Sequence, residues 1–568
     1  MDFSKIDVTT HQKIARMIVL EAIDRTFKNR DHFQKFRNKI IKREKGVIFH
    51  NLYFVKAYED LVKEGKIEEN EDFAGLIKKR SVRTMSGVAP VTVMTKPWPC
   101  PGKCTYCPTD VRMPKSYLPS QPAAQRGFRQ RFDPYAQVYV RLKALEMTGH
   151  KVSKVELRIL GGTWSSYKKQ YRTWFVKRCL QAMNEYGRVR SEEFGVGSRE
   201  RTVTNRIESR YGVDKVNTLM VKSIGGPSVC FDEVVKENET AKVRCIGVNI
   251  ETRSDHIDVK EIQHLRRLGV TKIEMGVQTT DDKVQELTRR GHDLQSVKDA
   301  TVLMKDAGFK LSFHMMPNLP GSTIELDKRM IGELFSDSAY QPDYLKIYPC
   351  VVIPRTSLAV QYRRGDYHPY DDETLFDILY ENMKDIPEWC RVDRVARDIP
   401  ADDIEAGFKI SNIRQFLEQK LEKEGIPCRD IRTREIQNLS YEMSDVELVE
   451  RVYASSGGKE FFLSYEDIQQ DRLIALLRLR FPGKTFLKEL SGAALIREVH
   501  VYGQQTAVGK SGKTKQHVGW GTKLMKDAED LAKKAGYKKL AVIAGIGTRE
   551  YYKKFGYRLE GTYMLKNI

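Results

Sequence analysis

Residues 96–109, KPWPCPGKCTYCPT, place three cysteines within eight residues. Cys100, Cys104 and Cys107 follow the pattern C-x3-C-x2-C, and no other Cys or His lies between residues 51 and 149. A structural zinc ion normally takes four ligands, so this loop is one ligand short. Three thiolates on a four-iron cube instead leave one iron without a protein ligand. The spacing therefore predicts a 4Fe-4S cluster with one open coordination position.

An open iron can bind the amino and carboxylate groups of S-adenosylmethionine, which one electron from a donor then cleaves to a 5′-deoxyadenosyl radical. A second motif supports this chemistry, because Gly161, Gly162 and Thr163 follow the strand-like stretch LRIL. Alone, this GGT would indicate only a turn. After the cysteine loop, it makes the sequence resemble the radical SAM superfamily, whose glycine motif contacts the methionine amino group.

Strand-like and helix-like segments alternate after the cysteines. Short apolar runs predict strands, and longer runs with a helical period predict helices. We expect strands at 88–94, 154–160, 245–250, 272–277 and 309–315, and helices at 134–149, 168–186, 259–268 and 294–307. This alternation is typical of a parallel sheet with helices on one side, closed or nearly closed into a barrel. The expected fold class is α/β, with a radical SAM partial (β/α) barrel.

Polar residues stand where several of these strands end. Glu251 and Arg253 follow one strand, and Gln278 follows the next. Ligands of such barrels bind at the carboxyl ends of the strands, so we expect these side chains to contact the ribose and carboxylate of S-adenosylmethionine. A local ion pair or a helix cap is an equal alternative. His314 has a similar position, but we expect a packed core histidine there.

The charge of the chain indicates a polyanionic partner. There are 97 Lys and Arg against 76 Asp and Glu, a net charge of +21. The alternative to a polyanionic partner is a basic, solvated surface. Within the helical residues 1–75, the stretch 28–45 interleaves Phe33 and Phe36 with cations, as a phosphate-binding helix would, and an ordinary exposed helix is an equal alternative. We therefore expect an N-terminal basic helical extension that binds nucleic acid.

A chain of 568 residues exceeds what one core holds. We expect the radical SAM domain at 76–389 with a polar insert at about 187–242, a linker at 390–440, and a second α/β domain at 441–568. No apolar run approaches the roughly 18 residues that span a bilayer, and the first residues carry no export signal. The sequence therefore predicts a cytoplasmic protein with reduced thiols and no membrane contact.

A glycine motif opens a helix in the C-terminal domain. The stretch QHVGWGT follows the strand-like LIREVHVYG, and its Gln516, Gly519 and Gly521 turn the backbone N–H groups of a helix start toward a diphosphate. With the following strand at 537–546 and the ending TREYYKKFGY, this order resembles the GNAT acetyltransferase fold, whose glycine loop holds the pyrophosphate of acetyl-CoA.

This second resemblance implies a set of acetyl-CoA contacts. They are Glu498, Val499, His500 and Val501 on the strand, Gln516, Gly519, Trp520, Gly521 and Thr522 in the glycine loop, and Tyr551 and Tyr552 near the thioester sulfur, as catalytic candidates. Neighbouring residues of a helix point to different faces, so one of the two tyrosines is expected to be only a core residue.

The two domains in this order resemble the family of Elongator catalytic subunits, the tRNA wobble-uridine carboxymethyltransferases. The stretches RSVRTMSGVAPVTVM, IETRSDH and CRDIRTREI add to the likeness, which spans nearly the whole chain. It implies an enzyme that uses S-adenosylmethionine radical chemistry and acetyl-CoA to carboxymethylate carbon 5 of the wobble uridine in the anticodon loop. Arg80, Arg83, the N-terminal helices and the insert are the expected tRNA contacts.

The resemblance also points to Lys169 as a catalytic or acetyl-CoA-binding lysine, with an exposed helix lysine as the alternative. The gap of three residues between Cys100 and Cys104 is like that of the stand-alone prokaryotic forms. Accessory protein subunits are therefore not required by this sequence.

Two other functions stay open. One is a protein lysine acetyltransferase with a structural iron–sulfur domain, in which Glu498 is the general base. The strong positive charge disfavours it, because lysine-rich substrates would be repelled. The other is a tRNA-binding scaffold with a vestigial cluster. The intact cysteine triplet and the intact glycine loop disfavour it. Cys350, Cys390 and Cys428 are a weak candidate for an interdomain zinc site, the alternative being separate buried thiols.

Overall fold

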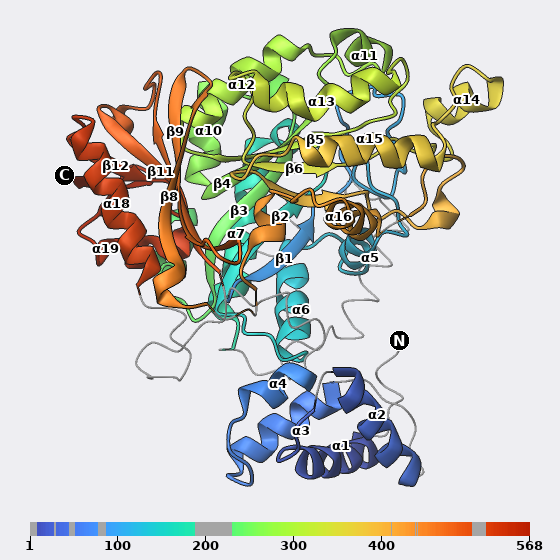
Figure 1. The fold of residues 1–568 in the computed structure, drawn as a ribbon, viewed down its shortest axis with the longest axis vertical. Coiled ribbons are helices and arrows are strands. Elements are labelled where there is room, and N and C mark those ends of the chain that lie inside the picture. Colours follow the sequence, from blue (N-terminus) through green and yellow to red (C-terminus); the bar gives the residue numbers. More distant parts are fainter. Residues whose placement is uncertain are drawn as a thin grey trace.

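The computed structural model describes residues 8–27, 30–44, 52–77, 87–187, 230–410, 412–437, 439, 441–502 and 519–568. Two seven-stranded sheets and a group of N-terminal helices make up this part of the chain (Figure 1). Arg80, Arg83, Gln516 and most of the predicted insert lie outside the described residues. None of the helices in these ranges is long and apolar enough to cross a membrane.

The N-terminal helices share a core of their own. They are α1 (Val8–Ala22), α2 (Arg30–Arg43), α3 (Leu52–Lys63) and α4 (Glu71–Ile77). Phe33 of the basic helix α2 is buried at the centre, edge-on to the rings of Phe54 and Phe73. The apolar residues of α2 therefore anchor it to its neighbours, while most of its cations stay outside this core.

The first sheet is wholly parallel, and its seven strands pair in the order of the sequence. The strands are β1 (Ala89–Met94), β2 (Lys154–Leu160), β3 (Arg244–Thr252), β4 (Val270–Gln278), β5 (Lys310–Met315), β6 (Tyr344–Ile347) and β7 (Arg391–Val395). The helices between and after them are α5 (Pro122–Arg129), α6 (Pro134–Glu146), α7 (Lys169–Glu185), α9 (Phe231–Asn238), α10 (Val259–Arg267), α11 (Asp282–Leu287), α12 (Leu294–Asp306), α13 (Ile324–Ser336), α14 (Ser357–Arg364), α15 (Asp372–Lys384), α16 (Ile413–Lys423) and α17 (Ile431–Arg434).

The structure confirms the strands and helices predicted between residues 88 and 315, with ends shifted by a few residues. The predicted linker at 390–440 is wrong, because its first residues form β7, the last strand of the parallel sheet, and α16 packs on the same core. A strand as short as β7 shows too little hydrophobic periodicity to be predicted from the sequence. Its pairing with β6 identifies it as part of the sheet.

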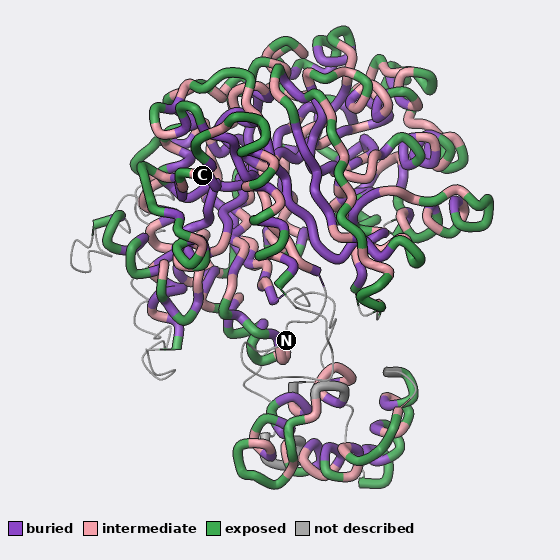
Figure 2. Tube along the Cα trace, turned by 60° about the vertical axis from the view of Figure 1, so that its left-hand side comes forward, coloured by how far each residue is buried: buried purple, intermediate pink, exposed green. Residues whose placement is uncertain are grey.

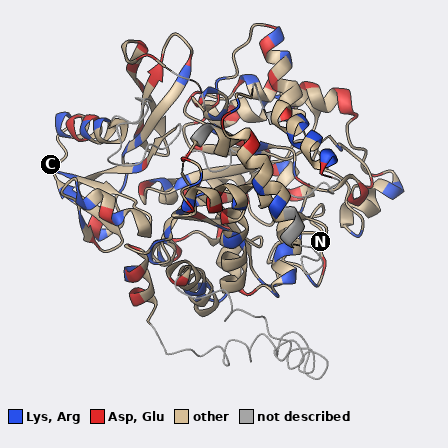
Figure 3. Ribbon diagram, turned by 90° about the horizontal axis from the view of Figure 1, so that it is seen from below, with Lys and Arg blue, Asp and Glu red and all other residues tan. Residues whose placement is uncertain are grey.

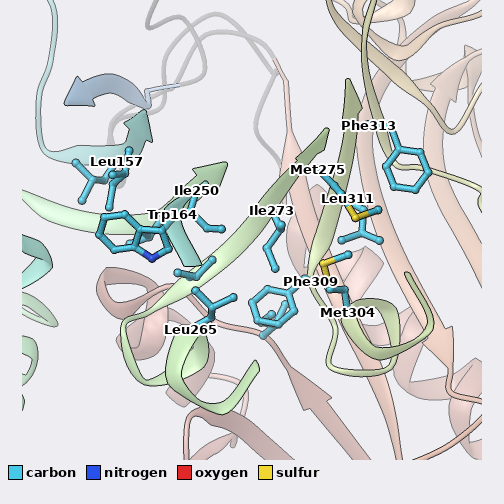
Figure 4. Packing of buried hydrophobic residues seen from close by; sticks show 14 of the residues in the cluster. Leu157, Trp164, Ile250, Leu265, Ile273, Met275, Met304, Phe309, Leu311 and Phe313 are labelled. Carbon is cyan, nitrogen blue, oxygen red and sulfur yellow. The ribbon is translucent and has the colours of Figure 1, made fainter. Parts of the chain in front are cut away.

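Each strand of the first sheet has one apolar and one polar face. In β2, Leu157 and Ile159 are buried toward the helices, whereas Glu156 and Arg158 point to the other side. Figure 4 shows Leu157 near Trp164, and Ile273 near Leu265 of α10, on the helix side of the sheet. The helices therefore cover the outer face, and the inner face of the curved sheet is polar.

The second sheet is mostly antiparallel and has the order β13-β14-β12-β11-β10-β9-β8. Its strands are β8 (Val446–Ser455), β9 (Gly458–Asp467), β10 (Arg472–Phe481), β11 (Ala493–Val501), β12 (Lys539–Val542), β13 (Arg558–Glu560) and β14 (Tyr563–Asn567), with helices α18 (Trp520–Lys534) and α19 (Arg549–Lys553). Its one described parallel pair is β11 and β12, on either side of α18 in sequence. A strand–helix–strand unit is thus set into an antiparallel sheet.

A buried ion network joins the two sheets. Arg497 of β11 donates to Asp343, just before β6, at 3.0 Å and to Glu460 of β9 at 2.9 Å. Arg480 of β10 donates to Asp306 at 2.8 Å and to Glu460 at 2.9 Å. These side chains are almost inaccessible to solvent, in line with the buried strands in the interior of Figure 2. Buried charges are tolerated only when they are paired, so the network fixes how the two sheets meet.

Removing one carboxylate from this network should destabilise the protein strongly. In Asp343→Asn, Arg497 loses one of its two carboxylate partners in a buried position, and we expect a loss of about 3–5 kcal/mol in unfolding free energy. Asp337→Asn is the matched control, because Asp337 pairs with Lys298 at an exposed site, where such pairs contribute less than about 1 kcal/mol. Thermal unfolding followed by circular dichroism measures both, and equal midpoints for the two variants would contradict the expectation.

Candidate active site

A cavity of about 750 Å³ opens at the carboxyl ends of the parallel strands. The three cysteines of the loop after β1 line it. So do Gly162 and Thr163 after β2, Glu251 and Arg253 at the end of β3, and Gln278 at the end of β4. The structure therefore brings the residues predicted to hold a cluster and S-adenosylmethionine to one place.

The cysteine loop is held by contacts to neighbouring strand ends. Cys100 Sγ lies 3.5 Å from Thr163 Oγ1, and Arg290 Nη1 donates to Cys104 Sγ at 3.4 Å. A side chain at Gly102 would collide with Arg253, since a Cβ there would lie 2.2 Å from Nη1. Burial, together with the Cys104 thiol, raises the pKa of Cys107 to about 11. Iron would reverse that preference, because metal ligation requires the thiolate.

The three thiols line one cavity without converging on one point. No group of three or more His, Cys, Asp or Glu side chains among the described residues is placed to hold a single metal ion. A 4Fe-4S cube does not need such convergence, because each thiolate binds a different iron. The donor set thus fits a cluster with three protein ligands better than a zinc ion.

The glycine turn after β2 positions a carboxylate. Gly161 has φ +149°, and a Cβ there would lie 1.8 Å from Thr95 Oγ1, so only glycine fits. The backbone N–H groups of Gly161 and Gly162 both donate to Glu251 Oε2 at 3.4 Å. Tyr117 Oη donates to Glu251 Oε1 at 2.8 Å. Tyr117 was missed by sequence reasoning, because it lies in a loop and belongs to no motif.

Several buried polar atoms in the cavity wall lack hydrogen-bond partners among the described residues, and two of them belong to residues predicted to bind S-adenosylmethionine. Arg253 donates to both oxygens of Asp255, at 2.9 and 2.8 Å, but its buried Nη1 has no hydrogen-bond partner among the described residues. The same holds for Oε1 of Gln278, whose backbone has the unusual φ of 78°. Unsatisfied buried polar atoms are costly, so a donor and an acceptor here suit a polar ligand such as S-adenosylmethionine. The residues present fit that group.

Glu274, His314 and Lys346 form part of the same wall. Glu274 accepts hydrogen bonds from His314 Nε2 at 2.9 Å and Asn249 Nδ2 at 2.6 Å, and it contacts Lys346. Burial alone would raise the pKa of Glu274, but Lys346 and His314 outweigh it and hold the pKa well below its usual range. His314 is therefore not the packed core histidine expected. Polar residues at alternate positions of two strands, KIEMG and YLKIY, were the available signal.

A second cavity of about 340 Å³ lies at the amino ends of the parallel strands, where the second sheet meets the first. It is lined by four residues of the predicted acetyl-CoA site, Glu498, Val499, His500 and Tyr552, and also by Lys310, Tyr344 and Tyr502. Tyr502, Lys310 and Tyr344 belong to no motif and were missed.

Glu498 is tightly held in this second cavity. It accepts hydrogen bonds from Tyr344 Oη at 2.6 Å and Arg478 Nε at 2.9 Å, and Lys310 Nζ lies 3.8 Å away. Burial would raise the pKa of Glu498, but Lys310 and Arg478 lower it to about 2. A carboxylate with so low a pKa is a weak base at neutral pH.

Other predicted residues lie elsewhere. Gly519 takes φ +69° just before α18, so the helix does open on the glycine turn. Trp520 turns into the core, where Nε1 donates to Tyr441 Oη at 3.0 Å. Tyr551 is 40% exposed, and its hydroxyl would lie 2.9 Å from a Cβ at Gly521. Val501, Thr522 and Lys169 line neither of the two cavities, and Lys169 is exposed at the start of α7.

The proposed zinc site gains no support. Cys350 and Cys390 are buried in different apolar clusters, and Cys428 lies beside Asp430 and Thr433. These thiols are part of no metal-binding group among the described residues. The alternative of separate thiols agrees with the structure.

Comparison with known proteins gives matches along the chain. Residues 100–330 match the radical SAM superfamily, and residues 342–423 match the radical SAM C-terminal domain. The tRNA uridine(34) acetyltransferase of Methanocaldococcus infernus is 39% identical over 98% of this chain and 100% of its own length. Elongator complex protein 3 of Homo sapiens is 37% identical, over 87% of this chain and 86% of its own.

A solved structure agrees with these matches. The archaeal Methanocaldococcus infernus Elp3, with residues 1–46 deleted, superposes with a TM-score of 0.70 at 38% identity. The superposition covers 85% of this chain and 100% of that one. The predicted radical SAM partial barrel followed by a second α/β domain is thereby confirmed.

Substitution at the glycine turn should impair binding of S-adenosylmethionine. In Gly161→Ala, the new Cβ meets Thr95 and the backbone keeps a φ that only glycine adopts easily, so we expect the affinity to fall about tenfold or more. Isothermal titration of the reconstituted protein measures it. Gly75→Ala is the control, since a Cβ there meets nothing within 4 Å. Unchanged affinity in Gly161→Ala would refute the assignment.

Loss of one cavity cysteine should prevent cluster assembly. In Cys104→Ser, we expect the iron content after anaerobic reconstitution to fall well below the about four atoms per chain of a complete cube. Cys230→Ser removes an exposed cysteine and should leave the iron content unchanged. Iron analysis and visible absorption measure both variants, and a full cluster in Cys104→Ser would contradict the ligand assignment.

Proposed function

This chain belongs to the family of tRNA uridine(34) acetyltransferases and Elongator complex protein 3, and from that membership we propose that it installs a carboxymethyl group on carbon 5 of the wobble uridine of tRNA, with acetyl-CoA as the carbon source. The names of its relatives give the nucleoside and the acyltransferase class. The carboxymethyl product and the use of acetyl-CoA are the parts that we add.

One observation carries the proposal: two cavities lie at opposite ends of the same parallel strands. One holds the cysteines and the glycine turn, and the other holds the strand Glu498–His500 predicted to bind acetyl-CoA. Plain acetyl transfer needs no radical, and a radical enzyme needs no acetyl-CoA site. A reaction at the acetyl methyl group uses both.

The first cavity would hold the cluster on its three cysteines and S-adenosylmethionine against Glu251, Arg253 and Gln278. When bound there, the cluster and S-adenosylmethionine would supply radical chemistry directed at the acetyl methyl group. The chain's own task is orientation. Glu251 is fixed by Tyr117 and two backbone N–H groups, so an amino group that it accepts from would have one position.

The rim of the first cavity suits an RNA loop. Lys115, Arg126, Arg394, Arg397 and Lys409 line it. In the view of Figure 3, Lys and Arg are interspersed with Asp and Glu along the ribbon of the described residues. Cations around the cavity would bind the phosphates beside an unstacked uridine, which is the form in which proteins reach a single base.

The lysine acetyltransferase alternative fits the second cavity less well. It requires a base, and the candidate Glu498 is engaged by Tyr344 and Arg478. Its pKa of about 2 leaves little proton affinity at neutral pH. The same contacts suit a residue that shapes the binding site.

Anaerobic reconstitution tests the proposal. The protein receives iron and sulfide, then S-adenosylmethionine, dithionite, acetyl-CoA and unmodified tRNA, and digested tRNA is analysed by mass spectrometry. We expect 5-carboxymethyluridine from the wild type and from Cys230→Ser, and none from Cys104→Ser. Acetylated protein lysines without modified tRNA would favour the acetyltransferase alternative, and product from Cys104→Ser would refute the radical mechanism.

A further inference from the structure

The two cavities adjoin inside the barrel. Pro90, Arg158, Arg391 and Asp393 line both of them. Four of the strands contribute one inward residue to the second cavity and another to the first. Glu156, Lys272, Lys310 and Tyr344 line the second cavity, whereas Leu160, Glu274, His314 and Lys346, further along the same four strands, line the first. The cavities therefore follow one another along the axis of the half-barrel.

The space between them is accessible. Arg158 lies in the middle of β2, between Leu157 and Ile159, which are at most 2% exposed. Yet the side chain of Arg158 is 39% exposed, and that of Glu156 is 23% exposed. A residue inside a sheet covered by helices can reach solvent only on the inner face. Its exposure therefore marks hollow space where the two cavities share a wall.

This interior is lined with paired charges. Arg158 binds Glu156 at 2.6 Å, and Lys272 binds Asp393 at 2.8 Å. Arg391 lies 3.5 Å from Asp393 and 2.7 Å from Glu435. Closed barrels of this class instead fill their interior with Val, Ile and Leu. Ions removed from water cost several kcal/mol each, so a charged interior is best tolerated where water still reaches it.

We infer that the interior of the half-barrel is the passage through which the acyl end of a bound acyl-CoA thioester reaches the radical site. The inference rests on the proposed function and adds a route to it. The thioester end is slender and uncharged, and its carbonyl oxygen is an acceptor. Arg158 and Lys272 provide donors along the wall that such an oxygen would pass.

The register of β1 provides a position at which to close the passage. Thr92 lies opposite Arg158 in the parallel pairing and lines the first cavity, so its side chain shares the layer where the cavities meet. Thr92→Phe adds bulk in that layer and leaves the cysteines and the glycine turn unsubstituted. Thr240→Phe, at an exposed turn after α9, is the matched control.

The first experiment follows deuterium from methyl-deuterated acetyl-CoA into 5′-deoxyadenosine in the reduced holoenzyme. In Thr92→Phe, we expect transfer to fall at least about tenfold, while cleavage of S-adenosylmethionine and binding of acetyl-CoA continue. The Thr240→Phe control should transfer like the wild type. Equal transfer by Thr92→Phe would overturn the passage alone. Absence of transfer in the wild type would overturn the proposed function, and the passage with it.

A second experiment needs no radical. Bromoacetyl-CoA carries an electrophilic methylene carbon, which a thiolate attacks with loss of bromide and formation of a C–S bond. In the holoenzyme of Thr92→Cys, we expect alkylation at residue 92 that excess acetyl-CoA suppresses. Thr240→Cys should be alkylated without such protection. Peptide mass spectrometry reads both sites, and no labelling at residue 92, or labelling that acetyl-CoA leaves unchanged, would overturn the inference.

Discussion

Successive side chains of a β-strand point to opposite faces, and in the first sheet each face has a different task. The outward residues, such as Leu157 and Ile273, form the core with the helices. The inward residues, such as Arg158 and Glu274, form the walls of the cavities. A shift of the register by one residue would bury the charges against the helices and turn the apolar side chains into the cavity. The alternation of apolar and polar residues along these strands therefore determines both the packing of the core and the lining of the cavities.

The second sheet depends on this arrangement through the ion network. Arg497 binds Asp343, just before β6, and Arg480 binds Asp306, at the end of α12. Because the contacts with Asp343 and Asp306 form only when the two domains meet in one orientation, they hold the second cavity against the amino ends of the parallel strands. Tyr344 extends the link, since it belongs to β6 and donates to Glu498 in β11. The two cavities thus share one rigid frame.

Local patterns predicted what depends on neighbours in sequence. The cysteine loop, the GGT turn and the strand 154–160 were found because each is a short, continuous signal. Contacts between distant segments were not found. Only the folded sheet brings Tyr117, Arg290 and Lys310 to the cavities. His314 was assigned to the core, although it binds Glu274 in the cavity wall. Trp520 shows a related limit, because its place in a glycine motif does not reveal that its side chain fills the core.

The N-terminal helices have a different relation to the rest of the chain. Their apolar residues, among them Ile18, Phe33 and Leu61, form a cluster to which the two sheets contribute nothing in the part of the chain that the structure describes. A segment with its own core can fold by itself. In evolutionary terms such a segment is a unit that can be gained, exchanged or lost without redesign of the catalytic body. Selection on binding at this end of the chain can then proceed independently of selection on the barrel.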